Sequence, residues 1–290
     1  MFTTLIEPLE LAKHVDESEW AIIDCRFELA RPEWGARAFA DGHIPHALYA
    51  HLDHDLSGAH TPRSGRHPLP EPVALAATFS RFGIDATVQV VAYDQGSSAY
   101  AARLWWLARW LGHRAVAVLD GGLAAWQSAG LPLSHTSETR PPRHFRGSAD
   151  ETMAVSTAEV AAAVAAGDLG AGRSLLVDAR SAERFAGRNE TLDTVGGHIP
   201  GALNHPFAGN HDPQGRFLPA TELRRAWAAT LGAAPPERLI AMCGSGVTAC
   251  HNLLALEVAG FPGARLYAGS WSEWIRDPAR PIARGAKDDG

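Results

Sequence analysis

The chain has 290 residues, of which 46% are hydrophobic and 20% charged, and its formal net charge is −6. This composition excludes a disordered chain, and the negative balance argues against a nucleic-acid-binding surface. No apolar stretch approaches the length of a membrane span, and residues 1–10 lack the basic region and apolar core of a secretory signal. We therefore expect a cytoplasmic protein with neither nucleic acid nor membrane among its partners.

Short apolar runs alternate with helical patterns in both halves of the chain. In the first half we expect strands at 21–24, 88–93 and 115–119 and a mostly buried helix at 99–111. In the second half we expect strands at 175–177, 239–242 and 265–267 and a helix at 249–260. Alternation of this kind predicts an α/β fold, with mainly parallel sheets flanked by helices.

An internal repeat divides the chain into two related halves. Ile-Ile-Asp-Cys-Arg at 22–26 and Gly-His-Ile-Pro at 42–45 recur, in the same order, as Leu-Val-Asp-Ala-Arg at 176–180 and Gly-His-Ile-Pro at 197–200. The polar, proline-containing stretch 136–152 has the composition of a linker. We therefore predict a tandem duplication, with a first domain at 1–135 and a second at 153–290. Residues kept in both copies, such as His43 and His198, are expected to be structural.

Cys243 is the most informative single residue. It follows the apolar run 239–242 and precedes the small residues Gly244, Ser245 and Gly246, after which the expected helix begins. A thiol between a strand end and a helix N-terminus meets backbone N–H groups and the positive end of the helix dipole, which favour the thiolate. The pattern predicts a cysteine nucleophile at the carboxyl end of a parallel strand, where ligands of such sheets bind.

The matching position in the first copy is Asp94, which cannot act as a sulfur nucleophile. We therefore expect the second domain to carry the chemistry and the first to be non-catalytic. The three cysteines, Cys25, Cys243 and Cys250, show no metal-site spacing, so neither a metal nor a cofactor is expected. Cys250 is interpreted as a packed thiol, with a redox role left open.

Three other classes of protein also depend on a reactive cysteine. A cysteine phosphatase needs an arginine six positions after the nucleophile, and that position is Ala249 here. A non-catalytic sulfur carrier or redox sensor would accept sulfur once and would not turn over. A papain-like protease is disfavoured by the cysteine loop and by the duplication.

The repeat, the twin Gly-His-Ile-Pro segments and the run Cys243-Gly-Ser-Gly-Val-Thr248 resemble the two-domain sulfurtransferases of the rhodanese superfamily. The resemblance covers nearly the whole chain. It implies that a persulfide forms on Cys243 and that its sulfur passes to cyanide or to a thiol acceptor such as a thioredoxin. Members with Gly-Ser-Gly after the cysteine use 3-mercaptopyruvate, a small anionic sulfur donor, whereas thiosulfate-using members carry basic residues there. Thiosulfate remains the alternative donor.

The resemblance also implies roles for particular residues. A Ser–His–Asp relay beside the cysteine would consist of Ser245, His67 and Asp55, with His67 moving protons and Asp55 fixing its tautomer. The substrate anion would bind Arg184. The loop residues Gly244, Gly246, Val247 and Thr248 would contribute to the binding site. Animal members of the family have a second arginine shortly before the second Gly-His-Ile-Pro segment. That arginine has no clear counterpart here, although Arg188 lies in the corresponding stretch, 188–193.

Overall fold

The computed structural model describes residues 1–169 and 173–285. The chain forms two compact units. The first contains Met1–Gly58, Leu69–Asp150 and His211–Phe217, and the second contains Ala59–Pro68, Glu151–Asn210 and Leu218–Gly290. Each unit thus includes a short segment from the other half of the chain, for which the sequence carries no signal.

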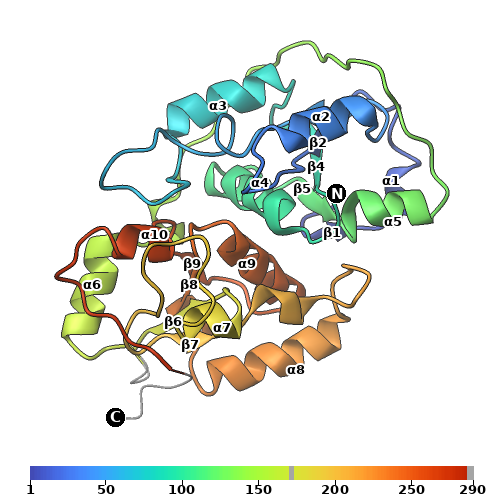
Figure 1. Ribbon diagram of the computed structural model, residues 1–290. Helices are drawn as coiled ribbons and strands as arrows, with labels where there is room; N and C mark the ends of the chain where they lie inside the picture. The colour runs from blue at the N-terminus through green and yellow to red at the C-terminus, as the bar shows by residue number, and fades with distance from the viewer. Residues whose placement is uncertain (170–172, 286–290) are drawn as a thin grey trace. The chain divides into compact units, whose positions relative to one another are not determined.

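The first unit is built on a five-stranded sheet of order β1-β5-β4-β2-β3, in which every recorded pair is parallel. Its strands are β1 (Leu5–Ile6), β2 (Trp20–Asp24), β3 (Leu48–Tyr49), β4 (Gln89–Tyr93) and β5 (Val116–Leu119). Its helices are α1 (Pro8–Leu11), α2 (Trp34–Asp41), α3 (Pro72–Arg81), α4 (Ala99–Trp110) and α5 (Gly122–Ser128). Helix α4, expected at 99–111, packs on β4 and β5 (Figure 1).

The second unit repeats this plan with a four-stranded parallel sheet of order β7-β6-β8-β9. Its strands are β6 (Leu175–Asp178), β7 (Leu203–Asn204), β8 (Leu239–Met242) and β9 (Arg265–Leu266). Its helices are α6 (Thr157–Ala165), α7 (Ala182–Phe185), α8 (Ala220–Leu231), α9 (Thr248–Val258) and α10 (Ser270–Trp274), with single 3₁₀ turns at Glu151–Met153, Phe207–Asn210 and Pro236–Arg238. The α/β class and the parallel sheets flanked by helices are therefore confirmed (Figure 1).

The repeated residues make the same contacts in both units. His43 and His198 each use Nδ1 to bond a backbone carbonyl at 2.8 Å, that of Phe39 and Phe185 respectively, and each stacks on the ring of that phenylalanine. Because the same arrangement occurs in the first unit, which has Asp94 at the position of Cys243, these contacts support a structural role for both histidines.

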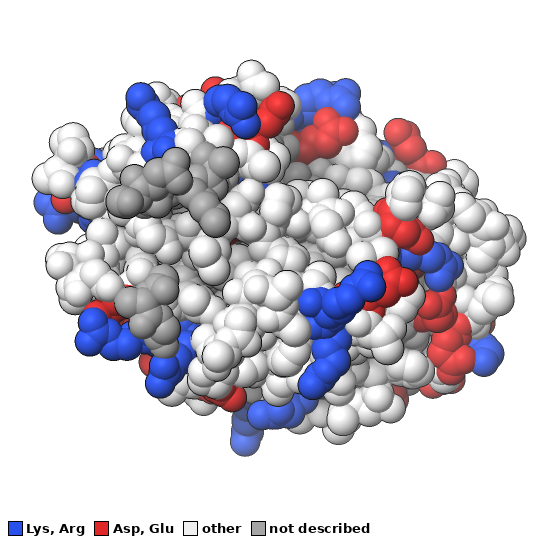
Figure 2. Space-filling view, turned by 90° about the horizontal axis from the view of Figure 1, so that it is seen from below, with Lys and Arg blue, Asp and Glu red and all other residues white. Residues whose placement is uncertain are grey.

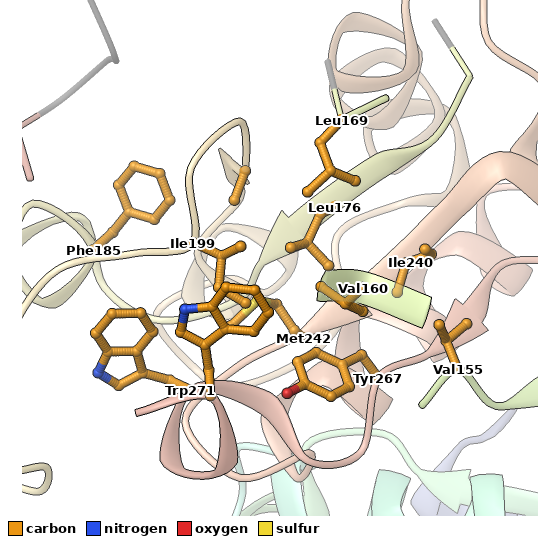
Figure 3. Packing of buried hydrophobic residues seen from close by; sticks show 12 residues of the cluster. Val155, Val160, Leu169, Leu176, Phe185, Ile199, Ile240, Met242, Tyr267 and Trp271 are labelled. Atoms are coloured by element: carbon orange, nitrogen blue, oxygen red, sulfur yellow. The ribbon is translucent and has the colours of Figure 1, made fainter. Parts of the chain in front are cut away.

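A buried core fixes the strand that leads to the site. All four residues of β8 are buried, and the side chain of Met242 packs in one cluster with Trp271 and Tyr267 (Figure 3). Residue 243 is thus held at the end of a rigid strand, because the residue before it is locked in the core. On the face drawn in Figure 2, acidic and basic side chains are interspersed among uncharged ones. Among the described residues, no helix is long and apolar enough to cross a membrane.

Candidate active site

Cys243 directly follows β8 and is only 2% exposed. Its backbone N–H donates to Ser270 Oγ at 3.0 Å, and its carbonyl accepts the N–H of Trp271 at 3.0 Å, so both of its peptide groups are tied to the start of α10. The N–H of Gly246 donates to Cys243 Sγ at 3.1 Å. An amide aimed at the sulfur stabilises negative charge there, as the loop sequence predicts.

The backbone angle and the close packing at position 246 require glycine. Its φ is +77°, and a β-carbon on it would lie 2.5 Å from the carbonyl oxygen of Ala268. Its carbonyl accepts the thiol of Cys250 at 3.2 Å. The loop therefore requires glycine at 246 both for its backbone angle and for its close packing. Val247 forms the N-cap of α9, and Thr248 is the first residue of that helix.

His67 and Ser245 meet within the second unit. The two atoms His67 Nδ1 and Ser245 Oγ lie 2.7 Å apart, and both side chains are buried. The segment that carries His67 is anchored by two preceding amides: Gly65 N–H donates to Glu273 Oε2 at 3.2 Å, and Arg66 N–H donates to Ser272 Oγ at 3.0 Å. The structure thus brings together two members of the expected relay, which are 178 residues apart in the sequence.

Asp55, the third expected member, belongs to the first unit. One carboxylate oxygen pairs with Arg81, and the other accepts the backbone N–H of His51 at 2.8 Å. These contacts hold Asp55 within its own unit, and its place in the relay stays a prediction.

Two guanidinium groups flank Gly244. A β-carbon placed on Gly244 would lie 2.9 Å from Arg66 Nη2 and 3.4 Å from Arg184 Nη2. Arg184 was expected at the site from the sequence, whereas Arg66 was not. The signal for Arg66 was its position directly before His67. Arg188, the other arginine considered, is exposed, and its backbone N–H donates to the carbonyl of Glu183.

Two carboxylates hold these arginines in place. Asp193 pairs with Arg66 through one oxygen and accepts from Arg184 Nη2 at 3.0 Å through the other. Glu190 accepts Arg184 Nε at 3.0 Å and also the backbone N–H groups of Leu192 and Asp193. Burial alone would raise the pKa of Glu190, but the hydrogen bonds from Arg184 and the backbone outweigh burial and lower it. Glu190 is therefore ionised at neutral pH.

In the matching loop of the first unit, the side chain of Asp94 accepts hydrogen bonds from the loop's own backbone. Asp94 accepts the backbone N–H groups of Gly96, Ser98, Tyr100 and Ala101. Burial nevertheless raises the pKa of Asp94. A carboxylate surrounded by loop amides shows that this strand–loop–helix unit forms an anion cradle, which in the first copy is filled from within.

The other cysteines sit in different surroundings. Burial and the nearby Asp24 carboxylate raise the pKa of Cys25 well above its ordinary value, which makes it a poor nucleophile. The three cysteines are free thiols. Within residues 1–169 and 173–285, no group of three or more His, Cys, Asp or Glu side chains could hold a metal ion.

Comparison with known proteins identifies the family of both halves of the chain. The rhodanese-like domain family matches the chain twice, at residues 7–129 and 157–277. The chain is 47% identical to a probable 3-mercaptopyruvate sulfurtransferase of Pseudomonas aeruginosa, over 97% of this chain and 98% of the relative. It is 39% identical to a putative thiosulfate sulfurtransferase of Mycobacterium tuberculosis, over 97% of each.

A solved structure of a similar protein has the same two-domain fold as this chain. The crystal structure of an Escherichia coli 3-mercaptopyruvate sulfurtransferase is 32% identical to this chain and superimposes with a TM-score of 0.79, covering 94% of this chain and all of the other. Sequence, duplicated fold and similarity therefore agree, and the chain belongs to the rhodanese family, with one rhodanese-like domain in each half.

Proposed function

We propose that the protein is a 3-mercaptopyruvate sulfurtransferase that works through a persulfide on Cys243. The observation that carries the proposal is the loop itself: a cysteine at a strand end, an amide 3.1 Å from its sulfur, and a buried Ser–His pair beside it. The Pseudomonas aeruginosa relative, named a probable enzyme of this type, supports the choice of donor.

In the first half-reaction, the Cys243 thiolate attacks the donor sulfur. A new S–S bond forms and the C–S bond of mercaptopyruvate breaks, and its electron pair leaves with the carbon as the enolate of pyruvate. The enolate needs a proton. Ser245 Oγ can supply it and recover a proton from His67, since the two atoms are 2.7 Å apart. A thiol then attacks the outer sulfur and restores Cys243, which predicts ping-pong kinetics.

The donor carboxylate binds the guanidinium groups that flank Gly244. Arg184 takes the role expected from the family resemblance, and Arg66 supplies the second cation. Guanidinium groups suit a carboxylate because they offer paired N–H donors in a plane. The absence of a side chain at Gly244 leaves room for these groups.

We also propose a thiol such as thioredoxin as the acceptor and a cytoplasmic location. All three cysteines are free thiols, which suits a reducing compartment where such an acceptor is available.

Thiosulfate is the second candidate donor. The two arginines beside Gly244 could attract a dianion, and one relative is named a putative thiosulfate sulfurtransferase. A non-catalytic carrier or sensor would fit the cysteine loop but would make the Ser245–His67 pair unnecessary.

Steady-state sulfur transfer to cyanide and to a dithiol tests the proposal, with mercaptopyruvate and thiosulfate compared for the wild type and for Cys243→Ser. We expect a higher kcat/KM with mercaptopyruvate, no turnover in the variant, and a mass increase of one sulfur atom on Cys243 after exposure to donor alone. A higher kcat/KM with thiosulfate would contradict the donor, and persulfide formation without turnover would favour the carrier.

A further inference from the structure

A single carboxylate bridges the two cations of the site. Asp193 pairs with Arg66 through Oδ1 and with Arg184 through Oδ2, and its side chain is 3% exposed. The same two guanidinium groups are the nearest neighbours that a β-carbon on Gly244 would meet, beside the nucleophile. Any anion that binds these arginines therefore meets the field of Asp193 as well.

The ion pairs that include Arg66 and Arg184 form a network whose charges cancel. Three guanidinium groups, those of Arg66, Arg180 and Arg184, face three carboxylates. Asp193 pairs with both Arg66 and Arg184. Glu190 lies within 4 Å of Arg180 and Arg184. Asp178 pairs with Arg180. Three positive and three negative charges leave this cluster neutral before a donor binds.

The negative charge of Asp193 affects donors of different charge unequally. A monoanionic carboxylate adds one negative charge to the cluster, whereas a dianion adds two, and both must approach a cysteine that is itself an anion when it reacts. Without Asp193 the cluster would carry one net positive charge, and it would attract a dianion about twice as strongly as a monoanion at the same position, whereas the neutral cluster gives the dianion no such advantage. The bridging contact also restrains both guanidinium groups, so they cannot turn freely to surround a second charged group.

We infer that Asp193 determines the charge class of the donor, admitting a monoanionic carboxylate and disfavouring a dianion such as thiosulfate. This inference rests on the proposed function and deepens it by naming the residue that selects between its two donors. Asp193 acts through the two arginines and through its own charge, and it takes no part in bond making.

Three variants test the inference. Asp193→Asn removes the charge and keeps the size, Asp193→Glu keeps the charge, and Glu183→Gln removes one charge from an exposed residue of α7 as a matched control. We expect Asp193→Asn to lower the ratio of kcat/KM for mercaptopyruvate to kcat/KM for thiosulfate by at least about tenfold. Asp193→Glu should restore much of the ratio, and Glu183→Gln should stay within about twofold of the wild type.

A purely structural role would lower kcat/KM for both donors together and leave their ratio unchanged, and that result, in a variant with a wild-type circular dichroism spectrum, would overturn the inference.

A second measurement needs no variant and no turnover. Pyruvate and sulfate, one a monoanion and the other a dianion, are compared at equal ionic strength for protection of Cys243 in the wild type against iodoacetamide, with the modified peptide identified by mass. We expect pyruvate to protect at a concentration at least about tenfold lower than sulfate. Equal or better protection by sulfate would overturn the inference even if mercaptopyruvate proved to be the donor. If neither donor were turned over, that result would count against the proposed function. The protection assay would still test the inference, because it needs no turnover.

Discussion

Gly244 and Gly246 lie in the same loop but meet different neighbours. A β-carbon on Gly244 would come against the ends of two flexible arginine side chains, whereas one on Gly246 would meet the backbone oxygen of Ala268. Side-chain ends can move, but a carbonyl fixed at the end of a strand cannot. The two glycines therefore serve different purposes: Gly244 leaves room for the cations, and Gly246 allows the loop to form.

Alanine substitutions at the two glycines should separate these purposes. Gly246→Ala places a side chain at φ +77° against a carbonyl, and it should lower the free energy of unfolding by at least about 2 kcal/mol. Gly244→Ala should change stability little but raise KM for mercaptopyruvate roughly tenfold, since it displaces Arg66 and Arg184. Urea denaturation and steady-state kinetics measure the two effects. A Gly244→Ala enzyme with a wild-type KM would contradict the placement of the arginines.

The Ser245–His67 pair makes a kinetic prediction. Without a route for the proton, the pyruvate enolate is protonated only by water, so His67→Gln and Ser245→Ala should each lower kcat with mercaptopyruvate roughly 100-fold while leaving formation of the Cys243 persulfide detectable. The double variant should be no slower than the slower single variant, because both residues act in one step. Independent, multiplying losses would argue against a relay. Asp55→Asn, measured in the same way, tests the predicted place of Asp55 in the relay.

At the scale of single elements, the Asp94 loop of the first unit and the Cys243 loop of the second are two uses of one structure. Each follows a central strand, β4 or β8, and leads into a buried helix, α4 or α9. In the first unit, four amides converge on a carboxylate, and in the second an amide points at the cysteine sulfur. Asp94 thus occupies the position that an anion would take among the loop amides, and it stabilises the loop.

Asp94→Asn should therefore destabilise the protein although it changes only one atom. The amide NH₂ of asparagine would face backbone N–H donors, which leaves buried donors unsatisfied, at a cost of roughly 2–3 kcal/mol. Urea denaturation near neutral pH gives the measurement, and Asp41→Asn at an exposed position of the same unit is the control. Equal stabilities of the two variants would show that the carboxylate does not hold the loop.

The elements and the cysteine loop could be predicted from the sequence because their signals are local. Strand β8 has the predicted bounds 239–242, and α9 begins one residue before the predicted start at 249. Strands β1, β3 and β7 were not predicted, because each has only two residues and shows no periodicity. The contact of Arg66 with Asp193 joins residues 127 positions apart, and no local pattern encodes it. The family resemblance supplied His67, whose own surroundings in the sequence are those of an ordinary loop.

At the scale of the whole molecule, stability depends on pH through buried acids whose pKa is raised by burial, such as Asp120. In the first unit, burial raises the pKa of Asp120 from 3.8 to about 6, although the backbone N–H of Phe217 donates to its carboxylate at 2.8 Å. The folded protein therefore binds a proton at Asp120 that the unfolded chain releases at lower pH. Ionisation of Asp120 costs stability, and this cost is absent below about pH 4 and fully present above about pH 6.

Asp120→Asn should remove this dependence and keep the hydrogen bond, since its side-chain oxygen can still accept the Phe217 N–H. The free energy of unfolding of the variant, relative to the wild type, should rise between about pH 4 and pH 7 by up to roughly 3 kcal/mol. Urea denaturation at several pH values provides the test. A difference that stays constant, or falls, across this range would show that Asp120 titrates normally in the folded protein.

The segment Ala59–Pro68 has a consequence for the history of the chain. It is covalently part of the first copy, yet it is folded into the second unit and brings Arg66 and His67 to the loop that contains Gly244 and Ser245. Cutting the gene at the repeat boundary would give one fragment with the cysteine and another with its partners, so neither would inherit a complete catalyst. In the proposed mechanism the first copy therefore supplies this segment to the site, and a chain reduced to the second copy would lack both residues.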